Sequence, residues 1–527
     1  MDFDEKGVHF FMPKINMPKQ DAGKTYLGAD VPPEYANLRA TLAENQEMID
    51  TLFLDVDILR KRVFSNAENQ DVKFCLYFSD GVSDGMMISQ QMLKPLILAK
   101  NLMQSGDVFS YVYHSMNFVG EISESSDVQE IVEGLTYGDS LLLVEGSNKG
   151  IIFNSKGFQL RGISEPEGEK VLTGPREGFV EGVMTNLSML RRRLRSHHLK
   201  IKFSSMGRQT KTGVCICYMD NIVNKKILAE LYRRLETIDM DGVLDAGYIQ
   251  EYIAEHSPLG FHTVGTTERP DVVAGRLLEG RIALFVDGSP VVLTLPYLFV
   301  ENFQSSEDYY IGNLYASYAR VLRLLSFFLT ITVPAAFVAI VGYHHELLPT
   351  GLMLSFTTAR QNVPLPAALE AFVMLLLFDI LRESGVRTPG YVGQAVGFVG
   401  GIVIGQSAVE ANLIAAPMVI VVAFAGITII MVPRLTMASL FARYMALLFA
   451  SLFGLPGLII WLSIVMVHVF NLQSFGVPSF MPTGNLRFQE VKDTFVRAAW
   501  PKILWRVSPL SENRKRTVSH TQHKEDK

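Results

Sequence analysis

The chain has 527 residues and a formal net charge of −5, so it is long enough for several domains and is not strongly basic. This small charge, without a dense basic stripe that includes aromatic residues, argues against nucleic-acid binding. The segment from Val321 to Phe470 is mostly Leu, Ile, Val, Ala, Phe, Met and Gly, whereas most charged residues precede it. The sequence therefore predicts a soluble part followed by a membrane part.

The N-terminal end carries no basic stretch followed by an apolar one. We therefore expect no cleavable signal peptide, and a first domain on the cytosolic side of a membrane. The cysteines Cys75, Cys215 and Cys217 lie in apolar, strand-like runs that lack the spacing of a metal site or a disulfide framework. We expect each of them to be a small buried hydrophobic side chain in a reducing compartment.

The soluble part shows an internal repeat of two α/β units. The apolar run at 73–78 ends in a polar turn and precedes a helical pattern, and the run at 214–219 does the same. The later strands at 140–147 and 282–289 each enter a turn followed by a second short strand. The two offsets, 140 and 142 residues between equivalent turn positions, nearly agree and favour a duplication. Two such lobes could close on a ligand or form a rigid docking platform.

A Gly- and Pro-containing connector separates the two units and includes a short helical pattern. Asn186 is a candidate cap for this helix, and Arg191, Arg192, Arg193 and Arg195 form its basic face. Such a face is usually solvated, and near a bilayer it can also contact anionic lipid headgroups.

We expect six regions, which make a multidomain chain with two duplicated α/β subdomains followed by an all-α transmembrane bundle. They are an N-terminal extension (1–65), a first soluble α/β subdomain (66–165), a linker with a helix (166–200), a second soluble α/β subdomain (201–318), a transmembrane helical domain (319–475) and a cytosolic basic tail (476–527).

Several apolar runs approach the length needed to span a bilayer, and basic residues concentrate on one side of the topology that they imply. This asymmetry predicts an even number of spans with both chain ends on the cytosolic side. Some runs are short, so tilted or re-entrant segments are compatible with the pattern. The candidate segments are 321–341, 364–381, 392–405, 411–432, 437–453 and 458–470.

A glycine ladder lies in the third apolar run and leads into a polar break. Small residues at every fourth position favour close helix packing in lipid, either within one subunit or between subunits; here they are Gly393, Gly397, Gly401 and Gly405. The polar residues that follow are candidates for lining a pore or a gate: Gln406, Ser407, Glu410 and Asn412. The alternative is that the break is the outer turn of a helical hairpin, with the carboxylate in water.

Two further carboxylates lie in the second apolar run. Glu370 and Asp379 are nine residues apart, which places them on opposite helix faces, so they cannot form one site. Asp379 is expected to pair with Arg382 near the helix end. For Glu370, a structural salt bridge to Arg443 or Arg360 and a role in an ion path both remain open.

No catalytic constellation is present in the sequence. His344-His345-Glu346 lacks the second histidine of a zinc protease motif, and neither a phosphate-binding glycine loop nor a nucleophile turn occurs. We therefore expect a protein that is not an enzyme and that has no cofactor or metal.

A series of motifs between residues 70 and 485 resembles the A-subunit family of GerA-type spore germination receptors. The motifs occur in order: Thr267-Glu268-Arg269-Pro270-Asp271, Gly280 to Pro290, Glu307-Asp308-Tyr309-Tyr310, His345-Glu346-Leu347-Leu348-Pro349, Asn362-Val363-Pro364-Leu365-Pro366, Leu381 to Arg387, Gly405 to Asn412, and Ser474-Phe475-Gly476-Val477-Pro478.

This resemblance implies a non-enzymatic, multi-pass subunit of a nutrient germinant receptor in the spore inner membrane. It implies a transporter-like B subunit and a lipoprotein C subunit as partners, contact with membrane lipid, and a homo-oligomer, in the family a pentamer. The oligomer would form a ligand-gated channel for monovalent cations whose opening starts germination. The alternative is a non-conducting scaffold or signal transducer for the transporter-like subunit, or a paralogue of the stage V sporulation AF type.

Overall fold

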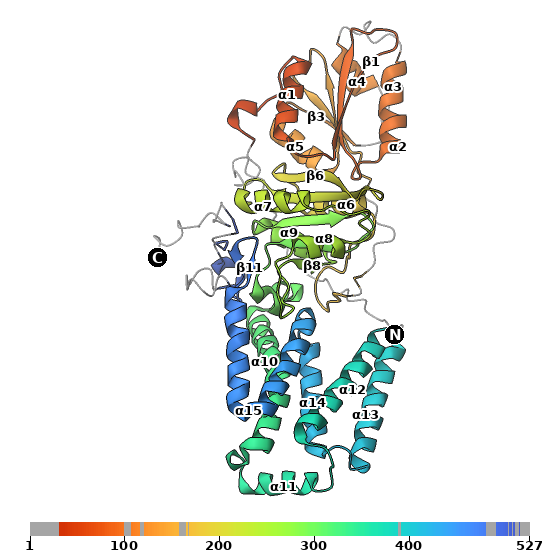
Figure 1. Cartoon of the computed structure of the whole chain (residues 1–527). Helices are drawn as coiled ribbons and strands as arrows, with labels where there is room; N and C mark the ends of the chain where they lie inside the picture. Colours follow the sequence, from red (N-terminus) through yellow and green to blue (C-terminus); the bar gives the residue numbers. More distant parts are fainter. Residues whose placement is uncertain are drawn as a thin grey trace, which may run out of the picture.

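The computed structural model describes residues 31–99, 107–115, 121–157, 165–166, 168–387, 391–480, 492–503, 505–507, 510–511 and 516, with the backbone alone at 115, 386–387 and 391–399. Two sheet domains are stacked along the long axis of the molecule, and a helical region extends from the second of them (Figure 1).

The first sheet domain holds a five-stranded antiparallel sheet with strand order β1-β2-β4-β5-β3. Buried apolar strands such as β2 and β4 form its centre because Val, Ile, Leu and Phe suit a pleated surface covered on both faces. Its elements are α1 (Leu42–Leu52), β1 (Leu59–Ser65), β2 (Lys73–Ser79), α2 (Gly85–Met87), the π-helix η2 (Ile88–Leu93), α3 (Lys94–Leu98), α4 (Val108–Ser115), β3 (Ile122–Ser125), α5 (Val128–Tyr137), β4 (Ser140–Val144) and β5 (Gly150–Phe153).

The second sheet domain repeats this topology, with strand order β6-β7-β9-β10-β8. The register is also repeated: Leu142 faces Ile151 across β4 and β5, and Leu284 faces Leu293 across β9 and β10, 142 residues later. The predicted duplication is therefore confirmed. The elements are α6 (Val183–Arg193), β6 (Leu199–Met206), β7 (Thr212–Met219), α7 (Lys225–Glu236), α8 (Ala246–Ile253), β8 (Gly265–Thr267), α9 (Pro270–Leu278), β9 (Ile282–Val286) and β10 (Val292–Leu295).

Each repeat begins earlier than the sequence indicated. Helix α1 and strand β1 lie within the expected extension 1–65, yet β1 pairs with β2 along its whole length. The equivalent helix α6 lies inside the expected linker 166–200. Strand β1 escaped prediction because it is an exposed edge strand with the sequence LRKRVFS, whose three basic residues hide the alternation of a half-buried strand.

The two sheet domains share one hydrophobic core, which runs from Ile49 and Leu52 of α1 through Leu187 and Leu190 of α6 to Leu277 of α9. Backbone hydrogen bonds add to it, because Asp57 N donates to Ile201 O at 2.9 Å and Ile201 N donates to Asp55 O at 3.0 Å. Such a continuous core favours a rigid platform over two lobes that close on a ligand.

Helix α6 uses its basic residues for internal contacts. Arg191 is buried and donates to Ser196 O at 2.8 Å, while Arg192 and Arg193 both pair with Glu177. Asn186 lies inside the helix, not at its cap, and bonds to the backbone of Val180. This face is therefore engaged within the protein.

Two short 3-10 helices, η3 (Phe299–Phe303) and η4 (Ser306–Tyr309), link the second sheet domain to the helical region. Among the described residues, two segments are long and apolar enough to cross a membrane by length and composition, α10 and the segment Pro433–Asn471. The elements are α10 (Asn313–Tyr343), η5 (His345–Leu347), α11 (Thr350–Arg360), α12 (Ala367–Arg387), α13 (Tyr391–Glu410), α14 (Ala416–Ile430), η6 (Pro433–Leu435) and α15 (Thr436–Asn471).

Helix α15 is a helical hairpin. Trp461 Nε1 donates to Ala442 O at 2.9 Å, although 19 residues of continuous helix would separate them by about 28 Å. The chain reverses at Gly454, which adopts φ 67° and ψ −145°. A Cβ at Gly457 would lie 2.1 Å from Phe449 O, so only glycine lets the two arms approach this closely. The two arms correspond to the separate segments expected at 437–453 and 458–470.

The bundle alternates in direction. Helix α10 leaves the second sheet domain, α11 lies at the far end, and the last arm of α15 returns to the sheet domain (Figure 1). Tyr343, at the end of α10, bonds to Ser451 at the turn of α15, and Ala415, at the start of α14, bonds to Glu370 near the start of α12. Both contacts lie at the far end.

The two short strands β11 (Gln473–Ser474) and β12 (Val477–Pro478) lie against the second sheet domain, and Tyr297 N donates to Ser474 Oγ at 3.0 Å. Further on, Leu510 is fully buried in the core of that domain. No local pattern predicts these anchors, because the apolar residues of this C-terminal segment alternate irregularly with charged and polar ones.

Candidate functional site

Four charged side chains meet where the second sheet domain joins the helical region. Asp308 of η4 and Arg320 of α10 are both fully buried, and Arg320 Nε lies 2.9 Å from Asp308 Oδ2. Arg323 also pairs with Asp308 at 2.9 Å, and Asp493 of the C-terminal segment pairs with Arg320 at 2.9 Å. We call these four residues the junction cluster.

The local sequence explains how the junction cluster forms. Arg320 and Arg323 are three residues apart, so they project from one face of α10. Asp308 is held in place because Ser305 N donates to its Oδ2 at 3.1 Å, which closes the turn before η4. Spare guanidinium donors reach backbone carbonyls, Arg320 at Thr494 O and Arg323 at Phe303 O, each at 2.9 Å.

Tyr309 completes the charge balance. Its hydroxyl donates to Asp493 Oδ2 at 3.0 Å. Burial and the neighbouring carboxylate of Asp493 raise the pKa of Tyr309, so the phenol stays neutral and acts as a donor. The cluster therefore has two positive and two negative groups and no net charge.

The cluster joins three segments that are distant in sequence. Removal of one member would leave a buried partner charge uncompensated, which typically costs about 3–5 kcal/mol. Aromatic residues pack beside it: Phe303 of η3 and Phe327 of α10 have ring centroids 5.9 Å apart. This arrangement suits mechanical coupling between the sheet domain and the helices, because all three segments must move together.

A second set of arginines holds the connector that precedes α6. Arg269 donates to Pro175 O at 2.7 Å and pairs with Asp271 at 3.0 Å. Arg434 of η6 pairs with Glu169 at 2.6 Å and donates to Glu301 O at 3.2 Å. The connector, the sheet domain and the bundle therefore meet at one place.

Glu370, a predicted site residue, is fully buried at the start of α12. Ala415 N donates to its Oε1 at 2.5 Å, and Arg360 Nη1 lies 3.2 Å from its Oε2. Of the two salt bridges considered, the chain forms the one to Arg360. Glu370 therefore ties α11 and the start of α14 to α12.

The predicted polar break lies mostly within a helix. Gln406, Ser407 and Glu410 belong to the last turns of α13 and are exposed, and Gln406 Nε2 donates to Glu410 Oε1 at 2.8 Å. The chain turns only at 411–415, where Asn412 has a φ of 55°. Among the described residues here, Gln406, Ser407 and Glu410 are helical and do not form an unwound segment. The chain turns directly after them, as in the predicted alternative of a helical hairpin.

Of the four glycines in the ladder, Gly401 and Gly405 have described surroundings within this chain, and packing between subunits stays a prediction. A Cβ at Gly405 would lie 3.4 Å from Val419 of α14, but one at Gly401 would meet nothing within 4 Å. Gly400, outside the ladder, approaches Leu381 of α12, at 3.1 Å from its added Cβ. Gly393 and Gly397 lie in the part of α13 where the backbone alone is described.

Asp379 makes a different pair from the one expected. Its Oδ2 accepts from Arg443 at 2.7 Å and from the hydroxyl of Tyr444 at 2.6 Å, both on α15. The prediction of a pair with Arg382 is therefore wrong. Arg443 is fully buried between the helices, so a partner across the bundle stabilises its charge where a surface pair would not.

The sequence reasoning gave no role to the junction cluster. The sequence shows Glu307-Asp308-Tyr309-Tyr310 only as a family motif, and Arg320 only as a basic residue beside an apolar run. Asp493 lies 173 residues from Arg320, so no local pattern pairs them. Among the described residues, no group of three His, Cys, Asp or Glu side chains is placed to hold a metal ion.

Residues 44–508 match the Bacillus/Clostridium GerA spore germination protein family. The chain is 37% identical to spore germination protein KA of Bacillus subtilis (strain 168), with 82% of this chain and 80% of that protein covered. It is 36% identical to the uncharacterized membrane protein YfkQ of the same organism, with 81% and 83% covered.

A solved structure was also found. It is the crystal structure of the N-terminal domain of the A subunit of the Bacillus megaterium spore germinant receptor GerK3, with 31% identity and a TM-score of 0.40, and it covers 50% of this chain and 98% of that one.

Proposed function

This chain belongs to the Bacillus/Clostridium GerA spore germination protein family, and on that basis we propose that it is an A-type subunit of a nutrient germinant receptor in the spore inner membrane. In this role the sheet domains receive a signal on the cytosolic side. The helical region converts it into a change across the membrane.

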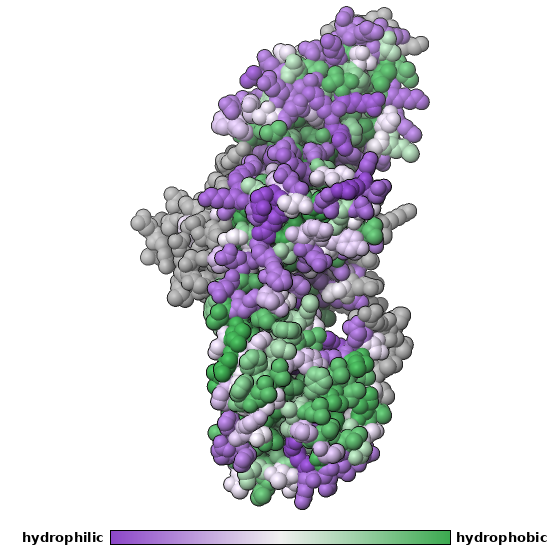
Figure 2. Space-filling model, viewed as in Figure 1, coloured by the Kyte–Doolittle hydropathy of each residue, from purple (hydrophilic) through white to green (hydrophobic). Residues whose placement is uncertain are grey.

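The observation that carries this proposal is the apolar surface of the helical region. Figure 2 shows apolar residues covering the outside of the helices, whereas the sheet domains present a mostly hydrophilic face. Large aliphatic side chains are strongly exposed there, for example Ile420 at 71%, Ile402 at 66% and Ile459 at 63%. Water-soluble monomers rarely expose such a continuous apolar surface, and lipid is its natural solvent.

The junction cluster supports the proposed direction of signalling. Arg320 and Arg323 lie on the first helix of the bundle, and Asp308 and Asp493 lie on the segments against the sheet domain. A displacement of the sheet domain is therefore transmitted to α10 through buried charge pairs. A signal from the proposed B and C partner subunits would take this route.

The exposed polar end of α13 supports a conducting role for a homo-oligomer. Val403, Gln406, Ser407 and Glu410 follow helical spacing on one exposed side of the helix. These groups adjoin the hairpin turn at 411–415, and rings of carboxylates at the mouth of a pore attract cations. Several copies arranged around an axis would place this face toward a common lumen for monovalent cations.

The scaffold alternative is favoured by a different observation. Glu370, the other candidate pore residue, is closed in by Arg360 and Ala415 of its own chain. In a non-conducting transducer, all intramembrane carboxylates would be engaged in this way or would lie in the aqueous loops.

Ion flux from liposomes that contain the purified oligomer separates the two functions. We expect potassium efflux from the wild type and at least a several-fold change in flux or cation selectivity for Glu410→Gln. Glu251→Gln, an exposed carboxylate on the second sheet domain, serves as the matched control. Absence of flux at every stoichiometry would contradict conduction and support the scaffold.

A further inference from the structure

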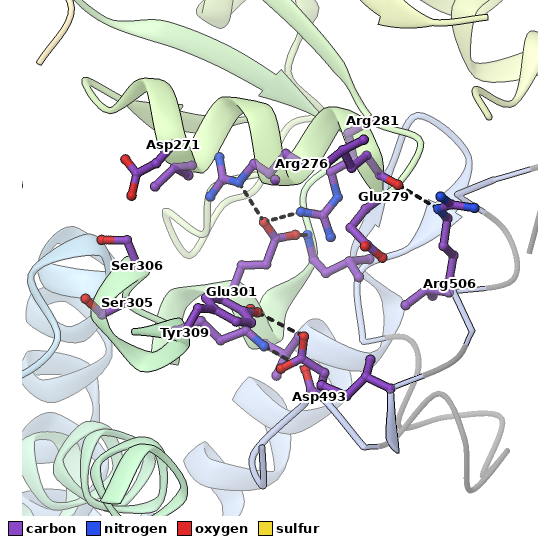
Figure 3. Close-up of a pocket in the computed structure, with 18 of the residues that line it drawn as sticks. Asp271, Arg276, Glu279, Arg281, Glu301, Ser305, Ser306, Tyr309, Asp493 and Arg506 are labelled. Atoms are coloured by element: carbon purple, nitrogen blue, oxygen red, sulfur yellow. Dashed lines mark hydrogen bonds and ion pairs between the residues drawn. The ribbon is translucent and has the colours of Figure 1, made fainter. Parts of the chain in front are cut away.

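A cavity of about 510 Å³ lies beside the junction cluster, between α9, the 3-10 helices η3 and η4, and the C-terminal segment. Figure 3 shows Arg276 and Arg281 pointing from the second sheet domain toward Glu301, and Arg506 of the C-terminal segment beside Glu279. The walls therefore come from two parts of the chain that are far apart in sequence.

The cavity wall has more arginines than carboxylates. Arg276 and Arg281 both pair with the same oxygen of Glu301, at 3.3 and 2.7 Å, and all three residues are at least nine-tenths buried. At the C-terminal end of α9, Arg506 and Arg516 flank the carboxylate of Glu279, which pairs with Arg516 at 2.5 Å. With Arg434, Asp271 and Asp493 included, the cavity is lined by five arginines and four carboxylates, an excess of one positive charge.

The guanidinium of Arg281 is incompletely satisfied, although its Nε is itself shielded from solvent, so a ligand reaches this group through its other nitrogens. Among the described residues, Nε of Arg281 has no hydrogen-bond partner. The other oxygen of Glu301 already accepts from Leu298 N at 2.7 Å, so this carboxylate has little capacity left for a second arginine. Burial lowers the pKa of Arg276 despite the opposing charge of Glu301, and the nearby Arg434 and Arg281 add to this lowering.

The remaining wall is apolar and aromatic. Trp500, Trp505, Ile503 and Val507 of the C-terminal segment line the cavity together with Leu298 of the second sheet domain. Trp500 and Trp505 are 52% and 40% exposed, which is unusual for tryptophan outside a binding surface or the bundle. The cavity thus combines arginines with an apolar and aromatic surface.

We propose that this cavity binds a small organic anion with an apolar body, whose acid group contacts the arginines and whose body lies against the tryptophans. Guanidinium groups recognise carboxylate and phosphate oxygens through charge-assisted hydrogen bonds, and aromatic rings cover apolar groups at low entropic cost. The bound anion holds the C-terminal segment against the second sheet domain. The anion is either a soluble molecule or the headgroup of an anionic lipid. The inference does not depend on ion conduction.

The test uses the tryptophans as reporters. The chain has three tryptophans, and Trp461 of α15 is the one outside the cavity, so Trp461→Phe leaves only the two that line it. Phenyl phosphate is titrated against this full-length protein in nanodiscs of neutral lipid. A parallel arm replaces part of the neutral lipid with phosphatidylglycerol.

We expect saturable change of the tryptophan emission with phenyl phosphate and no change with phenol, which has the ring without the charge. Arg281→Met should weaken the binding by about tenfold or more, the loss expected for one charge-assisted contact. It leaves Glu301 paired with Arg276, so the fold is expected to persist. Arg506→Gln provides a second variant, and Arg208→Met, an exposed arginine of the same domain, is the control.

A response to phosphatidylglycerol alone that Arg281→Met removes would support the site and identify a lipid as the anion source. No response in either arm, or the same response in Arg281→Met and Arg506→Gln as in the unsubstituted protein, would overturn the proposal.

Discussion

The two sheet domains share strand order and register but differ at equivalent positions of one helix–strand unit. At the 142-residue offset, Arg276 of α9 replaces Gly134 of α5, and Arg281 replaces Asp139. Asp127 caps α5 by accepting from Gln129 N, whereas Arg269 begins α9 without a side-chain cap and instead binds Asp271 and Pro175. The glycines directly before Asp139 and Arg281, Gly138 and Gly280, both adopt a positive φ.

This difference shows how one scaffold serves two purposes. In the first repeat, the unit contains ordinary turn and cap residues. In the second repeat, the same positions hold buried arginines: Arg269 binds the connector before α6, and Arg276 and Arg281 bind Glu301 and line the cavity. The fold therefore does not distinguish the repeats; the charged residues placed on it do.

We expect the largest loss of stability from a substitution in the junction cluster. Asp308→Asn leaves Arg320 and Arg323 with one carboxylate between them, so we expect the free energy of unfolding to fall by about 3–5 kcal/mol. A comparison in the first repeat is Asp139→Asn, at the position that Arg281 occupies in the second repeat, which removes a pair with Lys156. Because burial already raises the pKa of Asp139, we expect it to cost only about 0–1 kcal/mol.

Chemical or thermal unfolding of both variants in detergent gives this comparison. Equal losses for Asp308→Asn and Asp139→Asn would show that the junction cluster contributes nothing beyond an ordinary ion pair.

An intermediate effect is expected at the first turn of the equivalent helices. Arg269→Met leaves the buried Asp271 with only the Tyr310 hydroxyl, at 2.7 Å, and frees Pro175 O. We expect a loss of about 2–4 kcal/mol and faster tryptic cleavage of the connector near Lys170 and Arg176. Asp127→Ala removes a helix cap and should cost about 1 kcal/mol without exposing the connector. Unchanged cleavage in Arg269→Met would argue against its role as an anchor.

The smallest effect concerns the boundary between the repeats. Burial, aided by His198, Lys200 and Arg191, lowers the pKa of His197 from 6.5 to about 4. Between these values the unfolded chain binds a proton that the folded chain refuses, so stability falls as the pH falls from about 6.5 to about 4. His197→Gln should reduce this fall, measured as the difference in Tm between pH 7 and pH 5. The exposed His256→Gln is the control, and an identical pH dependence in both variants would remove His197 as its source.

The repeat and the helical segments could be predicted from the sequence because apolar strands and long apolar runs leave strong patterns. The two arms of α15 were separable because Gly454 and Pro456 interrupt the apolar run. Strand β1 was not predictable, since its exposed residues are basic. The junction cluster was also out of reach, because Asp493 joins Arg320 only after the chain has traversed the whole bundle. For Glu370, one of the two predicted salt-bridge partners, Arg360, is correct. The pairing of Asp379 with Arg443 depends on helix packing that composition does not encode.

The most direct test of the account is the sidedness of the two ends of the helical region. Glu346→Cys at the far end and Arg208→Cys on the second sheet domain are both well exposed, and the native cysteines Cys75, Cys215 and Cys217 are buried. In sealed vesicles of uniform orientation, a membrane-impermeant maleimide should label only one of the two positions, and both after permeabilisation. Equal labelling of both positions in intact vesicles would contradict a helical region that spans the membrane with the sheet domains on one side.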